Sequence, residues 1–381
     1  MVQVEFLPIT SPKTLYPLTA FESSKNLLWG AASLQEIWKF KIQKEVPQLR
    51  DFGHKISIRE NLVPSTVAWR DIEEAGPDST WVQGGEILFQ WTSDQKAEMT
   101  TREVPTTWQV LSRPTDWFSL ADDAIQESMD FAKTKWRLTL ANQLPDHVTL
   151  IGPVERVWIG PDVKLTACTL NATTGPIVIG PEAEIQEGCH IRGPLILGRE
   201  SVLKMGCRIY GPTVIGPQCK VGGEISNSVF LGHSNKAHDG FLGNSVIGQW
   251  CNLGADTNTS NLKNTYGDIR LYNHESETLE PTGLQFCGLI LGDHSKCGIN
   301  AMFNTGTVVG PGCNIYDSGF PPKHVPAFRW GSAQGGWVEH NVEKMLVTAK
   351  AVMARRGVTL TAEAEDRIRT AHASAFPSGN G

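Results

Sequence analysis

The sequence predicts an all-β parallel β-helix that is preceded by an α/β domain and followed by C-terminal helices. Three observations predict this fold class. Aliphatic residues fall on every sixth position in the middle of the chain, the first part lacks this period, and the last part has helical spacing. Neither an α-helix nor a flat strand repeats every six residues. A period of six is typical of a β-helix in which each hexad forms one side of a prism and three hexads close a coil.

The six-residue period marks the residues that point into the prism. They are Ile179, Ile185, Ile191, Leu197, Leu203, Ile209, Ile215 and Val221, and later Leu291, Cys297, Phe303, Val309 and Ile315. Glycine often follows the inward residue, where the chain turns and a side chain would obstruct it. Small residues, including most of the eight cysteines, recur four places after it. A buried free cysteine behaves as a small hydrophobe, so these cysteines need no redox role.

The chain divides into three predicted parts. Residues 1–140 hold most of the tryptophans and are expected to form an α/β domain. Residues 141–318 form the β-helix, and residues 319–381 form a bridge and helices. A polar insertion from 256 to about 281 interrupts the β-helix, and solenoids place such insertions as loops on one face.

Local patterns locate further elements inside these parts. Helical spacing at 33–40 and 120–138 predicts helices in the first domain, and 86–91 is expected to be a strand. Near the end of the chain, helices are expected at 338–356 and 361–373, and Gly357 stands where a helix C-terminus prefers glycine.

Composition narrows the class of function. A formal charge of -6 and a pI near 6.0 argue against bulk nucleic-acid affinity, which requires a basic face. No stretch approaches the roughly 18 apolar residues that span a bilayer, and the N-terminus lacks a signal-peptide pattern. We therefore expect a cytoplasmic protein without a membrane or nucleic-acid partner.

The densest polar cluster in the β-helix runs from 222 to 261. The period continues through it at Val229, Phe241, Ile247 and Leu253, while the outward positions carry charged and amide groups. Within it, His238 stands beside an aspartate, and an imidazole held on a rigid wall near a carboxylate suits a general base. The alternative is that these are solvated turn residues, because turns favour Asn, Asp, Gly and His.

At this cluster the sequence resembles a known family. HDGFLGNSVIGQWCNLGADTNTSNLKN, with KMGCRIYG before it and TGLQFCGLILGDHSKCGINAMFNTGTVVG after it, is similar to the acyltransferase half of the bifunctional bacterial N-acetylglucosamine-1-phosphate uridylyltransferase/glucosamine-1-phosphate acetyltransferase family. The resemblance runs from 176 to 356 and is strongest to the short alternative form. It implies a left-handed coil, acetyl-CoA as co-substrate, and a homotrimer with active sites between subunits.

The resemblance also implies roles for individual residues. His238 matches the catalytic base, which deprotonates the sugar amine as it attacks the acetyl-CoA thioester, and Glu224 matches the acid that orients this base. The other implied site residues are the sugar contacts Asn252 and Asn261, the phosphate candidates Arg208 and Lys236, and Phe241 in place of a sugar-site Tyr. Backbone amides at Gly254 and Ala255 are expected to bind the oxyanion.

The N-terminal part retains only some of the sequence segments that are typical of the alternative family. The segment Pro17-Leu18-Thr19 is present, but residues 20–30 (AFESSKNLLWG) contain no Arg, and Lys25 is their only cation. A nucleotidyltransferase must neutralise triphosphate charge with Arg or Lys and a metal. We therefore expect the fold to be retained with nucleotidyl transfer weakened or lost. Mg²⁺ and UTP or dTTP would be needed only if this domain is active.

Two other groups of residues have plain structural interpretations. Asp293, His294, Cys297 and Cys287 lack the paired spacing of a metal site, and Cys297 falls on an inward position, so core packing is expected. His274 lies among acids in the insertion and is expected on a solvated rim.

Three functions remain open. The leading hypothesis is an acetyl-CoA-dependent N-acetyltransferase that acts on an amino-sugar 1-phosphate, such as glucosamine 1-phosphate, for nucleotide-sugar or cell-envelope precursors. The alternatives are a sugar-1-phosphate nucleotidyltransferase, alone or coupled to the first activity, and a non-catalytic trimeric scaffold. Because solenoid coils are stabilised mainly by their neighbours, deletion of residues 1–140 is expected to leave acetyl transfer largely intact.

Overall fold

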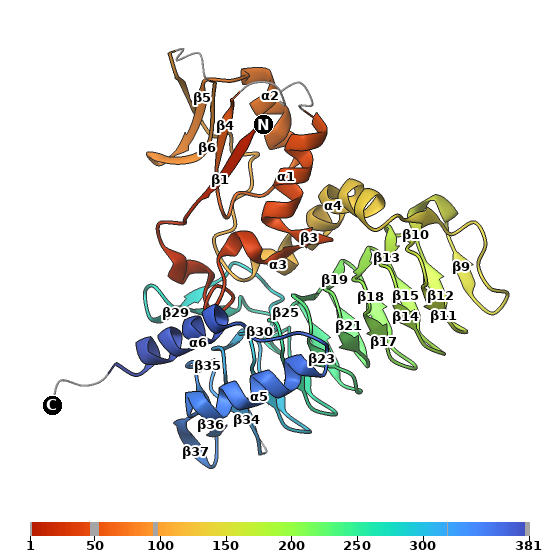
Figure 1. Cartoon of the computed structure of the whole chain (residues 1–381). Helices are drawn as coiled ribbons and strands as arrows, with labels where there is room; N and C mark the ends of the chain where they lie inside the picture. The colour runs from red at the N-terminus through yellow and green to blue at the C-terminus, as the bar shows by residue number, and fades with distance from the viewer. Residues whose placement is uncertain (1, 46–52, 94–97, 318, 378–381) are drawn as a thin grey trace.

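The computed structural model describes residues 2–45, 53–93, 98–317 and 319–377. The predicted fold class is confirmed. A parallel β-helix is capped along one side by an N-terminal α/β domain and carries two C-terminal helices (Figure 1). The position predicted for the end of the β-helix, residue 318, lies outside the described residues, and sheet strands continue beyond it to Glu339.

Three sheets form the sides of the prism, and we name each by what lies outside it. The covered sheet lies under the N-terminal domain and contains β8 (Thr139–Leu140), β10 (Val157–Ile159), β13 (Ile177–Ile179), β16 (Leu195–Leu197), β19 (Thr213–Ile215), β22 (Val229–Phe230), β25 (Val246–Ile247), β30 (Leu289–Leu291), β33 (Thr307–Val309) and β35 (His324–Val325).

The second side is the α5-facing sheet. It contains β11 (Lys164–Leu165), β14 (Glu184–Ile185), β17 (Val202–Leu203), β20 (Lys220–Val221), β23 (Asn235–Lys236), β26 (Asn252–Leu253), β31 (Lys296–Cys297), β34 (Asn314–Ile315), β36 (Arg329–Ser332) and β37 (Gly336–Glu339). The third side, the open sheet, contains β9 (Thr149–Ile151), β12 (Thr169–Asn171), β15 (His190–Arg192), β18 (Arg208–Tyr210), β21 (Glu224–Ser226) and β24 (Phe241–Gly243), and the pair β27 (Asn258–Thr259) and β32 (Met302–Phe303) lies beyond it.

The predicted inward residues from Ile179 to Val221 and from Leu291 to Ile315 are buried in one apolar cluster, as expected. The period shifts between these stretches. Phe230 and Leu242 point into the prism, so the predictions for Val229 and Phe241 are wrong by one residue, whereas Ile247 is inward as predicted. The cause is irregular spacing: Ile225 follows Val221 after only four places, Phe230 follows Ile225 after five, and Ile247 follows Leu242 after five.

All eight cysteines are free and buried. Burial raises the pKa of every one of these thiols, to about 11 for Cys168 and further for Cys207 and Cys251. Thiols that stay protonated are poor nucleophiles and metal ligands, in agreement with a packing role.

The N-terminal domain is an α/β unit built on one mixed sheet. Its strands lie in the order β1 (Gln3–Leu7), β4 (Lys55–Arg59), β6 (Glu86–Thr92), β5 (Ser79–Gln83) and β7 (Thr100–Glu103). Its helices are α1 (Leu34–Glu45), α2 (Thr66–Ala75), α3 (Asp116–Ser119) and α4 (Ala121–Lys135), with a short hairpin of β2 (Leu28–Trp29) and β3 (Ala32–Ser33). The predicted strand at 86–91 and helices at 33–40 and 120–138 are therefore present.

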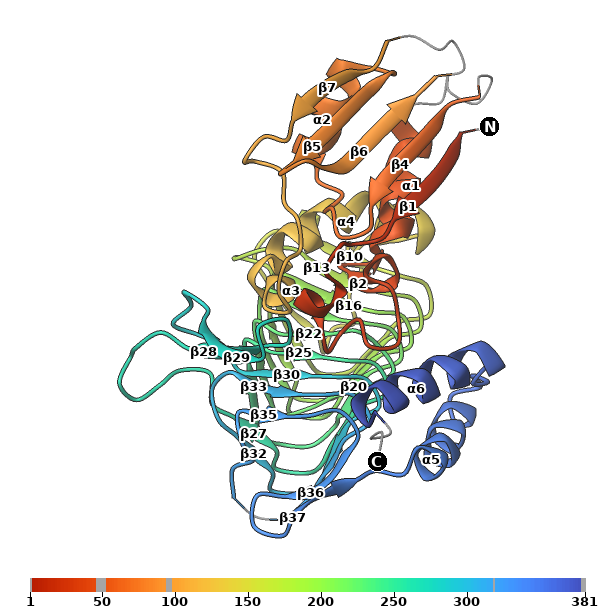
Figure 2. The same cartoon turned by 90° about the vertical axis from the view of Figure 1, so that its left-hand side faces the viewer.

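This domain shares a hydrophobic core with the β-helix. Outward aliphatic residues of the covered sheet, among them Val178, Ile196 and Val214, belong to one buried cluster with Trp117 and Phe118 of α3 and with residues of α4. In Figures 1 and 2, α3 and α4 lie between the N-terminal sheet and the coils. The β-helix is therefore not the self-contained unit on which the deletion prediction rested, and that prediction must be revised.

The insertion forms a hairpin of β28 (Arg270–Asn273) and β29 (Thr278–Pro281) that packs on the N-terminal domain. Ser11 donates to Glu275 at 2.6 Å, and Arg113 donates to the carbonyl oxygen of Thr282 at 3.1 Å. The hairpin projects from the coils in Figure 2.

His274 in this hairpin is not on a solvated rim, so that prediction is wrong. Its ring packs 4.3 Å from the ring of Tyr16 and 5.0 Å from that of His324, and burial lowers its pKa to about 3. The ring of Tyr16 therefore holds His274 in the contact between the N-terminal domain and the hairpin.

Two helices, α5 (Val342–Ala354) and α6 (Ala362–Ala375), follow the last coil as predicted. Each begins at a side-chain cap: Asn341 accepts from the amide of Lys344, and Thr361 accepts from that of Ala364. Helix α5 lies against the outer face of the prism (Figure 1). In the part of the chain that the structure describes, no helix is both long and apolar enough to cross a membrane.

Candidate functional site

His238 lies at the corner where the chain passes from the α5-facing sheet to the open sheet. It follows β23 and precedes β24, and its side chain is exposed. Below it, the turn of the preceding coil consists of two glycines. A Cβ on Gly223 would lie 2.6 Å from the carbonyl oxygen of Gly240 and 3.0 Å from that of His238. Only glycine allows this close approach. Because of Gly222 and Gly223, the His238 corner packs directly on the coil below.

Lys236 supports the same corner from inside the prism. Its Cα pairs with that of Val221, an inward position, and only 1% of the residue is exposed. The ammonium donates to the carbonyl oxygens of His238 and Asp239, each at 2.8 Å. Burial lowers the pKa of Lys236 to about 8. The expectation that Lys236 contacts a substrate phosphate is therefore corrected: its charge is directed at the backbone of the corner and away from solvent.

Arg208, Glu224 and Phe241 form a row on the outer surface of the open sheet. Their Cα atoms are partners on the successive strands β18, β21 and β24. The guanidinium Nε of Arg208 lies 3.5 Å from Oε2 of Glu224, and both side chains are substantially exposed. Within the described residues, Glu224 forms no hydrogen bond or ion pair with His238. The carboxylate therefore pairs with Arg208 in the single chain, and the predicted contact with the base is not formed there.

Phe241 and Asn261 meet above Gly243. A Cβ at Gly243 would lie 2.6 Å from Nδ2 of Asn261 and 2.6 Å from Cζ of Phe241, so the missing side chain leaves the space that these two groups fill. Asn261 donates to Oδ1 of Asn244 at 2.8 Å. Asn258, which the sequence prediction omitted, accepts the amide proton of Phe241 at 2.8 Å and fixes this strand. The position of Asn258 in the Asn-rich segment is the sequence signal that could have identified this residue.

Two other predicted contacts lie elsewhere. Asn252 is on the α5-facing sheet, next to Asn235, and not on the open sheet with Arg208. The amide of Gly254 donates to the carbonyl oxygen of Cys297 at 3.1 Å, as part of the stacking of the coils. The prediction that the amide of Gly254 binds the oxyanion is therefore wrong. Ala255 lies in the next turn of the same corner as His238, where its carbonyl accepts from Asn300.

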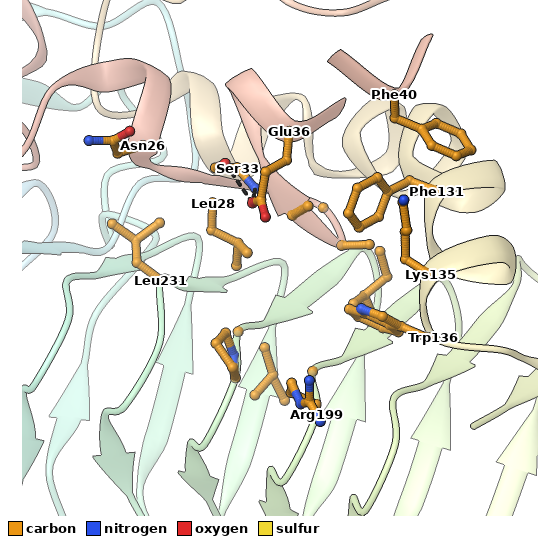
Figure 3. A pocket seen from close by; sticks show the side chains of 18 of the residues that line it. Asn26, Leu28, Ser33, Glu36, Phe40, Phe131, Lys135, Trp136, Arg199 and Leu231 are labelled. Atoms are coloured by element: carbon orange, nitrogen blue, oxygen red, sulfur yellow. Dashed lines mark hydrogen bonds between the residues drawn. The ribbon is translucent and has the colours of Figure 1, made fainter. Parts of the chain in front are cut away.

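A cleft of about 660 Å³ separates α1 and α4 from the coils below them. Figure 3 shows Phe40, Phe131 and Trp136 along one side, with Lys135 and Arg199 at the same end. Glu36 is turned back to Ser33, whose hydroxyl donates to it at 2.6 Å. The cleft lies on the covered sheet and does not reach the His238 corner.

The described residues contain no group of three or more His, Cys, Asp or Glu side chains arranged to hold a metal ion. Asp293 and His294 are buried beside the coil turn at Gly248, where Asp293 accepts from the amide of Gln249 at 2.7 Å. Burial raises the pKa of Asp293 to about 7 and lowers that of His294 to about 3, which is typical of groups packed in a core.

No protein-family model matches the chain. It is 33% identical over 92 residues to the bifunctional protein GlmU of Methanocaldococcus jannaschii, a match that covers 24% of this chain and 22% of the relative. It is also 33% identical over 144 residues to a bifunctional sugar-1-phosphate nucleotidylyltransferase/acetyltransferase of Sulfurisphaera tokodaii, which covers 37% of this chain and 35% of the relative. The chain thus matches between about a fifth and a third of the length of these curated relatives.

Two solved structures give low overall similarity. The polysialic acid O-acetyltransferase OatWY has a TM-score of 0.25 at 11% identity, covering 51% of this chain and 86% of that one. The N-acyltransferase AntD of Bacillus cereus, in complex with dTDP and coenzyme A, has a TM-score of 0.23 at 12% identity, covering 55% and 91%. The resemblance seen in the sequence is confirmed by the curated relatives: over part of its length, the chain is similar to bifunctional sugar-1-phosphate nucleotidylyltransferase/acetyltransferases.

Proposed function

We propose that the β-helix is an acetyl-CoA-dependent N-acetyltransferase that acts on an amino-sugar 1-phosphate. One observation carries the proposal: an exposed His238, on a corner held by Lys236 from within, lies beside the row of Arg208, Glu224 and Phe241. An imidazole, a guanidinium, a carboxylate and an aromatic ring on one edge of a rigid prism support this assignment. The name of the Sulfurisphaera relative, which includes an acetyltransferase, supports the reaction class.

The proposed reaction follows from these side chains. His238 accepts a proton from the sugar amine while the amine nitrogen attacks the thioester carbon of acetyl-CoA. A nitrogen–carbon bond forms, the carbon–sulfur bond breaks, and coenzyme A leaves as a thiol after it takes a proton. Arg208 is suited to the sugar phosphate, since its exposed guanidinium presents a planar set of donors, and the ring of Phe241 is suited to one face of the sugar. The amide of Ala255 is the candidate oxyanion donor.

We infer that the active protein is a homotrimer. Exposed apolar side chains follow the same corner as His238: Met205 and Ile299 are each 69% exposed, and Tyr316 is 45% exposed. Ile299 and Tyr316 follow one another on successive coils of this corner, and their exposed apolar surface supports a contact with a second subunit. A second subunit on this corner would bring its own groups to His238, including the outward Asn252 that lies on another side of the same chain. Light scattering should give a trimer, and a monomer of about 42 kDa at micromolar concentration would refute this inference.

A thiol assay tests the proposed reaction. Glucosamine 1-phosphate and acetyl-CoA are mixed with the intact protein, and free coenzyme A is followed with a thiol reagent. We expect release that depends on both substrates. The non-catalytic scaffold predicts no release above the rate of spontaneous hydrolysis.

Nucleotidyl transfer by the N-terminal domain is the second candidate, because the name of the Sulfurisphaera relative includes it. The structure gives little to hold a triphosphate in residues 20–30: Lys25 lies 6.0 Å from the ring centre of Phe6. A neighbouring cavity is lined by Lys13, Arg329 and Arg367, and Arg367 already donates to Glu22 at 2.7 Å. We expect no pyrophosphate release from UTP or dTTP with magnesium and N-acetylglucosamine 1-phosphate. Robust release would make the protein bifunctional.

A further inference from the structure

A small pocket lies between the C-terminal end of α5 and the α5-facing sheet. Its volume is about 210 Å³. One wall is a column of outward residues on four successive strands, Lys220, Asn235, Asn252 and Lys296, whose Cα atoms are paired along the sheet. Arg355 and Arg356, at the end of α5, form the opposite wall. The figures show α5 lying along this side of the prism.

The pocket has an excess of positive charge. Four of its ten lining residues are Lys or Arg and none is Asp or Glu. His233, which also lines it, is held neutral, since burial and the nearby Arg356 lower its pKa to about 4. The net charge of the lining at pH 7 is therefore strongly positive.

Two of these cations are held in place by neutral groups. Arg356 donates to the carbonyl oxygen of Gln218 at 2.7 Å and to Oδ1 of Asn235 at 2.8 Å. Lys296 donates to the carbonyl oxygen of His294 at 3.0 Å, and burial lowers its pKa. Across the described parts of the chain, no carboxylate forms an ion pair with any of the four cations. Cations gathered in a partly enclosed space without a counter-charge favour the binding of an anion.

The partial charge at the end of α5 explains only two of the four cations. Arg355 and Arg356 stand at the C-terminus of α5, where cations offset the partial negative charge of the helix. Lys220 and Lys296 come from the prism, and no helix end requires them. Their alignment with two amide side chains gives a wall of hydrogen-bond donors.

We propose that this pocket binds a phosphate or diphosphate group of a substrate. Phosphate oxygens accept from ammonium, guanidinium and amide donors together, which is the donor set present here. Asn235 is three residues before His238, so the pocket and the proposed base lie on neighbouring sides of the same coil. Both substrates of the proposed reaction carry such a group: the sugar at its 1-phosphate, and coenzyme A at its diphosphate and 3′-phosphate.

Calorimetric titration of the full chain with inorganic pyrophosphate tests the pocket without an activity assay. We expect one site per chain, and we expect Lys220→Gln to weaken binding by at least about tenfold through loss of a charge-assisted contact. Lys164→Gln is the matched control, because Lys164 is an exposed outward lysine farther along the same sheet. No binding, or equal affinity in the two variants, would overturn the proposal. Arg355→Gln, on the other wall, should weaken binding as Lys220→Gln does.

Competition then identifies the source of the group. Glucosamine 1-phosphate, acetyl-CoA and acetyl-dephospho-CoA are each titrated against bound pyrophosphate. Displacement by the sugar phosphate alone assigns the pocket to the sugar, and displacement by acetyl-CoA assigns it to coenzyme A. Weaker displacement by the dephospho form would identify the 3′-phosphate. Displacement by none of them would overturn the assignment to a substrate. Binding is measured directly, so a failed acetylation assay would leave this test unaffected.

Discussion

Replacement of Lys236 by methionine separates stability from activity. Methionine has a similar length and no charge, so it fits the inward stack between Val221 and Leu253. A pKa of about 8 for Lys236, against an ordinary value of 10.5, means that burial of the charge costs roughly 3 kcal/mol of unfolding free energy at neutral pH. The variant regains this energy and loses two charge-assisted hydrogen bonds, each worth about 1.5 kcal/mol. We therefore expect Lys236→Met to be no less stable than the parent protein at pH 7.

The pH dependence of this effect has a defined sign. Below pH 8 the lysine is protonated in both the folded and the unfolded protein, so its cost is constant. Between pH 8 and 10.5 the unfolded chain binds more protons, and the parent protein gains stability as pH rises. Lys236→Met lacks this gain. Urea unfolding at pH 7 and pH 10 should show that the advantage of the variant becomes smaller at the higher pH.

Activity should move in the opposite direction. Without the ammonium, the carbonyl groups of His238 and Asp239 lose their anchor and the base loses its fixed position. Displacement of a catalytic group by about 1 Å costs on the order of 100-fold, so we expect kcat to fall by about 10- to 100-fold with little change in KM. Lys164→Met, an outward lysine of the same sheet, should keep parental kcat. Parental kcat in Lys236→Met would refute the positioning role, as would a fall in kcat that follows a loss of cooperative unfolding.

Three further predictions concern the base, its neighbours and the N-terminal domain. His238→Ala should lower acetyl transfer by roughly 10²- to 10⁴-fold with an unchanged melting temperature, and a parental rate would exclude His238 as the base. Glu224→Gln should cause a smaller loss, and it should also lower KM for the sugar phosphate, since removal of the competing carboxylate frees Arg208 for the phosphate; an effect as large as that of His238→Ala would contradict this. Deletion of residues 1–140 should cause aggregation, because seven or more outward aliphatic residues of the covered sheet would lose burial worth on the order of 10 kcal/mol. A monodisperse, active deletion variant in light scattering would show that the shared core is dispensable.

The prism could be predicted because its pattern is local. One inward residue on each side repeats every six positions, so Ile179 to Val221 could be placed without knowledge of any distant contact. The shared core also left a signal. Segments such as Ile177–Ile179 and Leu195–Leu197 are aliphatic on both faces of the strand, which is typical of a sheet covered on its outer side.

The site was less predictable because it depends on departures from the pattern. Lys236 occupies an inward position. A search for aliphatic residues at inward positions does not identify a charged residue there. Ile247 follows Leu242 after five residues instead of six, so counting six places back from Ile247 predicted Phe241 inside. The cationic pocket joins Arg356 to Gln218 and Asn235, which are more than 100 positions away in the sequence, and a local pattern contains no information about such contacts.

The most direct test of the account is coenzyme A release by the intact protein with acetyl-CoA and glucosamine 1-phosphate, measured beside His238→Ala. We predict that thiol appears in equal amount to N-acetylated sugar phosphate, identified by mass spectrometry, and that the variant loses this release while it keeps the parental melting temperature and oligomeric state. No thiol release above the spontaneous rate, across a panel of amino-sugar 1-phosphates and with a folded protein, would contradict the acetyltransferase and favour the scaffold.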